Sequence, residues 1–138
     1  MTHVVEEDSP GKRVMLLGND ALARGAIEGG VRVVASYPGT PSSEITDTLA
    51  QVARNLGFYV ETSVNEKVAF DVAVGASLVG VRAMTCAKNA GVLWFADMFT
   101  TVTYGGIRGG FVIVAADDPE ARYSSSQHDS RWIAMDAE

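Results

Sequence analysis

The chain has 138 residues, a size that fits one domain with a buried core. Its formal net charge is −6, so the broad basic surface that nucleic-acid binding requires is not expected. No apolar run approaches the ~18 residues of a membrane-spanning helix, and the first ten residues lack the apolar core of a signal peptide. We therefore expect neither nucleic acid nor membrane as a partner.

Cys86 is the only cysteine and the chain has two histidines, His3 and His128. One cysteine excludes an internal disulfide and an intrachain cysteine cluster for iron–sulfur or structural zinc. We interpret Cys86 as a small buried apolar residue in a reduced, cytoplasmic protein. A metal site built from this chain alone is not expected.

Strand-like and helix-like segments alternate along the chain. After a disordered tail at residues 1–12 and a short apolar segment at 13–17, we expect helices at 21–28, from Ser42 or Ser43 to 56, at 65–79 and at 89–104. The expected strands are 31–36, which is β-branched and continuous, 58–62, 81–87, and 111–116, which is all apolar. This alternation predicts an α/β fold, a doubly wound parallel sheet with helices on both faces. Ligands of such sheets bind beyond the carboxyl ends of the strands.

The turn from Tyr37 to Glu44, Tyr-Pro-Gly-Thr-Pro-Ser-Ser-Glu, follows the first expected strand. Pro38 and Pro41 restrict the backbone on both sides of Thr40, and the serines that follow can cap the next helix. The turn could be a rigid connection only. Alternatively, Thr40 presents its hydroxyl to the crevice and binds a carboxylate or carbonyl oxygen of a small substrate.

Glu66 opens the most apolar helix. The helical period places Ala69 and Phe70 on its face, whereas Lys67 and Asp71 are spaced as an ion pair on the solvated side. Glu66 could be an acid favoured in a first turn by the helix dipole. Alternatively, a carboxyl directed toward packing could share a proton with a ring nitrogen.

Polar residues after the later strands meet the same edge of the predicted sheet. Lys88 and Asn89 follow the third strand, and Asp117-Asp118 follow the fourth, where a turn is also a sufficient explanation. The stretch from Gly105 to Gly110 lacks the Gly-Lys-Ser/Thr ending of a phosphate loop and is interpreted as a turn. Trp94 and Phe95 are expected in the core or at an interface.

Several ordered motifs resemble one family. They are the segments 18–25, 37–44, 63–69, 112–119 and 125–131. Together they resemble the N-terminal domain of 2-oxoacid:ferredoxin oxidoreductases, and within that family the α subunit of indolepyruvate ferredoxin oxidoreductases. The resemblance runs from about Gly18 to Arg131. It implies a thiamine-diphosphate-enzyme pyrimidine-binding domain over residues 13–138.

The resemblance also implies roles for individual residues. The family's glutamate that binds N1′ of the aminopyrimidine falls on Glu66, which makes it the expected catalytic and cofactor-activating residue. The threonine of the family's Pro-x-Thr-Pro motif falls on Thr40, expected to contact the cofactor or substrate. We further expect Pro38 and Phe70 at the cofactor, and Lys88 and Asn89 at the substrate.

The implied reaction converts a 2-oxoacid of the arylpyruvate type and coenzyme A to acyl-CoA and CO2, with reduction of ferredoxin. No Gly-Asp pair of the diphosphate-binding motif occurs in this chain. We therefore expect a fragment or small subunit, inactive alone, in a homo- or hetero-oligomer. A partner domain or chain would bind the diphosphate and Mg2+, and partners would carry iron–sulfur clusters. The alternatives are the small α chain of a non-oxidative 2-oxoacid decarboxylase, or a non-catalytic dimerising module.

Overall fold

The computed structural model describes residues 3–120, 122 and 129–137. Residues 123–128, which include the first four residues of the last family motif, lie outside the described residues. The four strands of the described part form a parallel sheet in the order β2-β1-β3-β4. The strands are β1 (Val33–Ser36), β2 (Tyr59–Thr62), β3 (Ala83–Lys88) and β4 (Phe111–Ala116). The predicted doubly wound α/β fold is confirmed.

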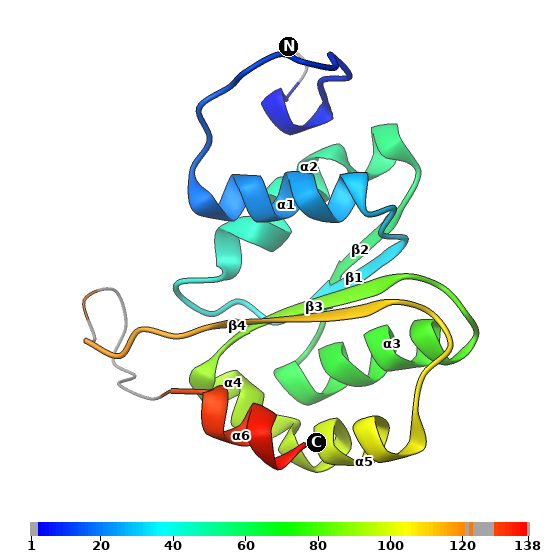
Figure 1. The fold of residues 1–138 in the computed structure, drawn as a ribbon, viewed down its shortest axis with the longest axis vertical. Coiled ribbons are helices and arrows are strands. Elements are labelled where there is room, and N and C mark those ends of the chain that lie inside the picture. Colours follow the sequence, from blue (N-terminus) through cyan, green and yellow to red (C-terminus); the bar gives the residue numbers. More distant parts are fainter. Residues whose placement is uncertain (1–2, 121, 123–128, 138) are drawn as a thin grey trace.

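Helices cover both faces of this sheet, as Figure 1 shows. Helices α1 (Gly18–Glu28) and α2 (Ser43–Leu56) lie on one face. The other face carries α3 (Glu66–Leu78), α4 (Asn89–Trp94), α5 (Ala96–Gly105) and α6 (Arg131–Asp136). The chain passes from β1 to one neighbour, β2, and then back across to the other neighbour, β3. The carboxyl ends of β1 and β3 therefore flank the switch point at which such sheets bind ligands.

Each face of the sheet buries its own apolar cluster. The strand period of two sends Met84 and Cys86 of β3 to one face and Ala87 to the other. The first cluster joins α1 and α2 to the sheet through Ala23, Val34, Ile45, Leu49, Met84 and Cys86. The second consists of Phe70, Val74, Ala87, Val92 and Phe95. The first cluster therefore holds α1 and α2 on one face of the sheet, and the second holds α3 and α4 on the other.

The long helix expected at 89–104 is wrong, because the chain breaks at Phe95 between α4 and α5. Phe95 is fully buried, and its ring stacks on Phe70 with 4.4 Å between centroids and 14° between planes. The non-helical backbone at Phe95 (φ −117°, ψ 14°) permits this contact. The adjacent Trp94 is 63% exposed.

The amino-terminal segment differs from the disordered tail that we expected at residues 1–12. Val4–Glu6 form a short 3-10 helix (η1), and Val5 is fully buried. The Arg24 guanidinium of α1 donates hydrogen bonds to the carbonyl oxygens of Val5 and Glu7 at 3.1 and 2.6 Å. Burial of one valine and a basic side chain from α1 hold this segment against α1 and α2 (Figure 1).

Candidate functional site

The turn after β1 is held by its own serines. We expected Ser42 or Ser43 to cap α2, but neither hydroxyl caps the helix. The Ser42 hydroxyl donates to the Gly39 carbonyl oxygen at 2.8 Å, and Ser43 Oγ accepts from the Gly39 N–H at 3.0 Å. Short polar side chains often choose nearby turn backbone over helix ends. The serines thus fix the backbone next to Thr40.

Thr40 is exposed at the tip of this turn. It lines a hollow of about 440 Å³ together with the first turns of α1 and α2. Asn19 of α1 donates to the Pro41 carbonyl oxygen at 2.9 Å and to the Glu44 carboxylate at 3.1 Å. The family motif near Gly18 therefore contacts the turn directly, which sequence reasoning did not anticipate. Pro38 is exposed in the same turn.

Lys88 lies against this turn from the neighbouring strand. A Cβ atom built at Gly39 would lie 3.3 Å from Lys88 Cγ, so the turn packs on the lysine's aliphatic stem. No ion pair engages the Lys88 ammonium group within the part of the chain that the structure describes. The structure thus brings Thr40 and Lys88, two of the predicted site residues, to the same corner of the sheet.

Glu66 begins α3 on the opposite face of the sheet. The Asn65 side chain caps this helix by accepting from the Val68 N–H at 2.9 Å. Glu66 is partly buried, whereas Ala69 and Phe70 on its face are buried, as the helical period predicted. Lys67 pairs with Asp97 of α5 at 2.8 Å and not with Asp71, because α5 packs beside α3.

The Glu66 side chain fills a space that Gly91 leaves open on α4. A Cβ atom at position 91 would lie 2.7 Å from Glu66 Cγ and 3.0 Å from Glu66 Oε1. No side chain larger than hydrogen fits there without moving the carboxylate. Among the described residues, no hydrogen bond or ion pair engages the Glu66 carboxylate. Sequence reasoning missed Gly91, although a glycine inside an expected helix often has a packing reason.

A second acid at the carboxyl edge of the sheet, Glu61 near the end of β2, differs from Glu66 because its carboxylate accepts hydrogen bonds. Hydrogen bonds from the Ser63 and Tyr59 hydroxyls hold the pKa of the Glu61 carboxyl below its ordinary value. Its two carboxylate oxygens therefore have donors, whereas those of Glu66 have none among the described residues. Of the two acids, Glu66 is the one available to a ligand.

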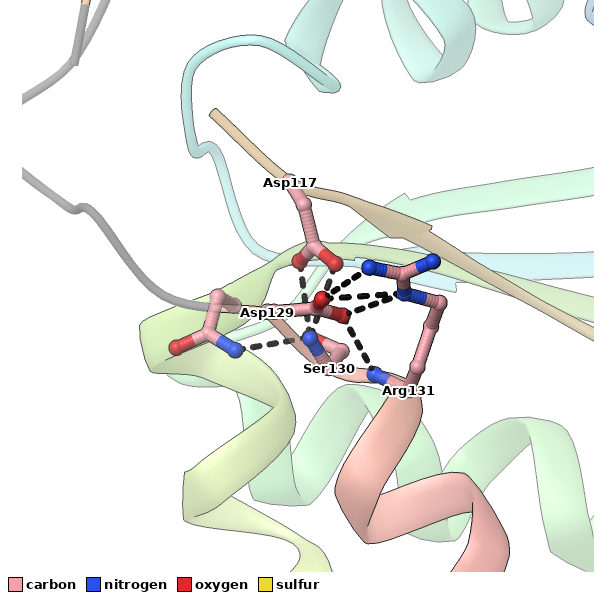
Figure 2. Close-up of polar contacts among 5 residues, drawn as sticks. Asp117, Asp129, Ser130 and Arg131 are labelled. Carbon is pink, nitrogen blue, oxygen red and sulfur yellow. Dashed lines mark hydrogen bonds and ion pairs between the residues drawn. The ribbon is translucent and has the colours of Figure 1, made fainter. Parts of the chain in front are cut away.

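Asn89 follows Lys88 and opens α4, where it is 2% exposed. Its Nδ2 group donates to Ser130 Oγ at 2.8 Å, and the Ser130 hydroxyl donates to Asp117 at the end of β4 (Figure 2). Neither Ser130 nor its link to Asn89 could be read from sequence, because 41 residues separate the two.

Phe70, predicted to lie at the cofactor, belongs to the aromatic core one helical turn from Glu66, and its contact with the cofactor stays a prediction. It is fully buried, with edge contacts to Phe99 and Phe111 in addition to its stack on Phe95. Cys86 is outside the site, because burial raises the pKa of its thiol to about 12, too high for a nucleophile.

Comparison with known proteins fits this arrangement. A family model described as pyruvate flavodoxin/ferredoxin oxidoreductase, thiamine diphosphate-binding, matches residues 24–117. The chain belongs to this family. The resemblance seen in the sequence is therefore confirmed, and thiamine diphosphate is the cofactor for which this domain type is named.

Curated relatives extend the match to nearly the whole chain. The indolepyruvate oxidoreductase subunit IorA of Pyrococcus horikoshii is 54% identical over 134 residues, 97% of this chain and 21% of the relative. The IorA subunit of Archaeoglobus fulgidus is 53% identical over 99% of this chain and 23% of its own length. The 2-oxoglutarate synthase subunit KorA of Methanocaldococcus jannaschii is 39% identical over 54% of this chain and 20% of its own length. The chain thus spans about a fifth of the length of the curated relatives it matches.

A solved structure shares the fold. The 2-oxoglutarate:ferredoxin oxidoreductase from Magnetococcus marinus, with 2-oxoglutarate, coenzyme A and succinyl-CoA bound, superposes with a TM-score of 0.69 at 24% identity. The match covers 74% of this chain and 18% of that one. At this identity the likeness shows the fold alone.

Neither a membrane-spanning helix nor a metal-ligand cluster occurs in the described part of the chain. No helix in it is both long and apolar enough to cross a membrane. Within the same ranges, no group of three or more His, Cys, Asp or Glu side chains is arranged to hold a metal ion.

Proposed function

We propose that this chain is the pyrimidine-binding part of a thiamine-diphosphate-dependent 2-oxoacid:ferredoxin oxidoreductase of the indolepyruvate type. The observation that carries the proposal is the Glu66 carboxylate, seated against Gly91 without a partner among the described residues. A carboxylate held in place with a free acceptor fits the N1′ nitrogen of an aminopyrimidine. Thiamine diphosphate, when bound, supplies the carbanion chemistry of 2-oxoacid decarboxylation.

The role of Glu66 is to hold a proton at the ring nitrogen of the pyrimidine. Gly91 keeps α4 close behind the side chain, so that the carboxylate is positioned before the cofactor binds. The aromatic core under α3, including the stack of Phe70 on Phe95, supports this helix. Such preorganisation removes the need to reorient a charged group during the reaction.

Thr40 and Lys88 supply hydrogen-bond donors for the substrate. A 2-oxoacid carries a carboxylate and a carbonyl oxygen, both of which accept hydrogen bonds. The aliphatic stem of Lys88 packs on the Gly39 turn at the end of β3, and Thr40 is exposed on that turn. Because Thr40 and Glu66 belong to opposite faces of the sheet, a ligand that reaches both must straddle the ends of β1 and β3.

The rest of the cofactor site belongs to partners. We propose that a diphosphate-binding domain or chain holds the diphosphate and its Mg2+, and that iron–sulfur clusters of the complex pass electrons to ferredoxin, with coenzyme A as acyl acceptor. Exposed apolar side chains on the two segments that carry Glu66 and Gly91 support such a partner. They include Val64, Val68, Leu93 and Trp94. A free, buried thiol at Cys86 fits a cytoplasmic setting.

The non-oxidative decarboxylase and the non-catalytic module are not favoured. The relatives with the highest identity above are named as oxidoreductase subunits, and they match this chain over nearly all of its length. The unpartnered carboxylate against Gly91 also serves no evident structural purpose in a module that only dimerises.

The decisive experiment replaces Glu66 in the assembled oxidoreductase. Glu66→Gln and Glu66→Ala should each lower turnover of 2-oxoacid at least about 100-fold, because the ring nitrogen loses its proton partner. Glu61→Gln is the matched control, since that acid lies at the same edge with its hydrogen bonds already made. Its turnover should stay within about threefold.

Thermal unfolding of each variant separates lost chemistry from lost folding. Turnover of Glu66→Ala within about threefold of the parent, or about 0.65 kcal/mol of barrier, would remove the proposed role.

A further inference from the structure

A chain of hydrogen bonds joins the end of β4 to the start of α4. The Asp117 carboxylate accepts twice from Ser130, from its backbone N–H at 2.8 Å and from its hydroxyl at 2.8 Å. The same hydroxyl oxygen accepts from Asn89 Nδ2 at 2.8 Å. Figure 2 shows Asp117 and Ser130 facing each other, with the Asp129–Arg131 pair beside them. Ser130 and Asn89 are both buried, at 4% and 2% exposure.

The chemistry of the three groups fixes the direction of every bond in this chain. An ionised carboxylate only accepts, so the single hydroxyl proton of Ser130 must go to Asp117. Ser130 Oγ then has lone pairs alone to offer to Asn89, and the amide must turn its NH2 group toward it. The amide oxygen of Asn89 therefore faces away from Ser130.

The Asn89 amide oxygen is buried and has no hydrogen-bond partner among the described residues. Asn89 Oδ1 is the single buried side-chain nitrogen or oxygen in the described ranges that has no hydrogen-bond partner. Buried polar atoms in proteins are paired in the large majority of cases, so an orphan calls for an explanation. Asn89 lies between Lys88, which packs on the Gly39 turn, and Gly91, which holds Glu66. The unpaired acceptor thus belongs to the first residue after β3, at the same carboxyl edge as the candidate site.

We infer that Asp117 and Ser130 are positioning residues that set the Asn89 amide so that its oxygen accepts a hydrogen bond from an N–H or O–H group of the bound ligand. The inference rests on the proposed function. The carboxylate and 2-oxo group of the substrate are acceptors and cannot pair with this oxygen. The donor is therefore a side-chain N–H or O–H of the 2-oxoacid, such as an indole N–H, or the amino group of the aminopyrimidine.

Asp117→Asn tests the inference with an isosteric change in the assembled oxidoreductase. The Ser130 backbone N–H will hold the new amide's oxygen, which leaves its NH2 group opposite Ser130 Oγ. The Ser130 proton is then released toward Asn89, and the Asn89 amide turns to present NH2 in place of oxygen. Each buried group keeps a hydrogen bond, so only the polarity at the ligand changes.

The first quantity to measure is the ratio of kcat/KM values for two substrates, which partial unfolding of the enzyme does not change. If the donor is the substrate's, kcat/KM for indolepyruvate relative to phenylpyruvate, which has no ring N–H, should fall about tenfold in Asp117→Asn. If the donor is the pyrimidine amino group, both substrates should lose equally and the Kd for thiamine diphosphate, measured by calorimetry, should rise about tenfold. Asn89→Ala removes the acceptor outright and should reproduce whichever pattern appears, even if Asp117→Asn does not fold.

The reciprocal double variant sharpens the test. Asn89→Asp alone places a second acceptor against Ser130 Oγ and should lower the same quantity. Combined with Asp117→Asn, it lets Ser130 donate to the new carboxylate on α4 while the second oxygen of that carboxylate faces the ligand. At least about half of the lost ratio or affinity should then return. Asp129→Asn, a partly exposed neighbour outside the chain of bonds, is the matched control and should leave both quantities unchanged.

Failure of the proposed function and failure of this inference give different results. Failure of the parent complex to turn over any 2-oxoacid would contradict the proposed function. An active parent whose substrate ratio and cofactor Kd both stay within about twofold in Asp117→Asn and Asn89→Ala, or a double variant without recovery, would overturn this inference alone.

Discussion

At the amino ends of the strands, Gly109 packs its backbone on the backbone of the loop before β3, and at the carboxyl ends Gly91 packs against the side chain of Glu66. A Cβ atom at Gly109 would lie 2.4 Å from the Val81 carbonyl oxygen, whereas one at Gly91 would lie 2.7 Å from Glu66 Cγ. The Gly109 contact joins two rigid backbones. The Gly91 contact positions one movable carboxylate.

The two edges also differ in whether their polar groups have hydrogen-bond partners. At the amino edge, the Ser77 hydroxyl donates to the Gly109 carbonyl oxygen at 2.7 Å and the Gly109 N–H donates to the Ser77 carbonyl oxygen at 2.8 Å. At the carboxyl edge, the Glu66 carboxylate and the Asn89 oxygen have no partners among the described residues. Satisfied polar groups stabilise one edge, and available ones equip the other for a ligand.

Replacement of Gly109 should give the largest effect on stability. Gly109→Ala forces a methyl group into the Val81 backbone, so the free energy of unfolding should fall by about 3 kcal/mol. Denaturant unfolding measures this loss, and turnover per folded molecule should not change. Gly110→Ala is the control, because its nearest neighbour would be Arg82 Cγ at 3.7 Å. Equal stability of the two variants would contradict a structural role for the amino edge.

Replacement of Gly91 should affect activity more than stability. Gly91→Ala displaces the Glu66 carboxylate, and a misplacement of about 1 Å can lower turnover about 100-fold, or roughly 2.7 kcal/mol of barrier. The free energy of unfolding should fall by less than in Gly109→Ala, because the closest atoms belong to the movable Glu66 side chain, although the new methyl group would also lie 3.1 Å from Ala87 Cβ. Gly75→Ala on α3, with no atom within 4 Å of its added Cβ, should leave turnover intact. Full activity in Gly91→Ala would remove the distinction between the two edges.

The smallest effect concerns Asp129, beside the carboxyl edge. Hydrogen bonds from Arg131 lower the pKa of the Asp129 carboxyl from 3.8 to about 2. Because the folded-state pKa is the lower one, the associated stabilisation is present above about pH 3.8 and is lost as the pH falls through about 2. Carboxyl carbon NMR against pH should show this titration, and Arg131→Ala should return it toward 3.8. Turnover above about pH 5 should be the same in both proteins.

The element pattern was predictable because local signals agreed with the fold. The strand expected at 111–116 is β4 without change, and α2 ends at Leu56 as expected, followed by Gly57 with φ 72°. Phe95 was missed because the break in the helix depends on its stack with Phe70, a residue of a different helix. The serines of the Gly39 turn were assigned to the wrong hydrogen bonds, since helix cap and turn compete for the same hydroxyls.

By itself, the sequence determined the α/β fold, the family, and the identity of Glu66 and Thr40 as candidate residues, because those depend on periodicity and on ordered local motifs. Only the tertiary structure decided that Gly91 backs Glu66, that Gly39 packs on Lys88, and that Ser130 and Asp117 orient Asn89. These contacts join segments that are distant in sequence or depend on side-chain direction across strand ends. A linear pattern carries no information on which groups meet there or which atom is left without a partner.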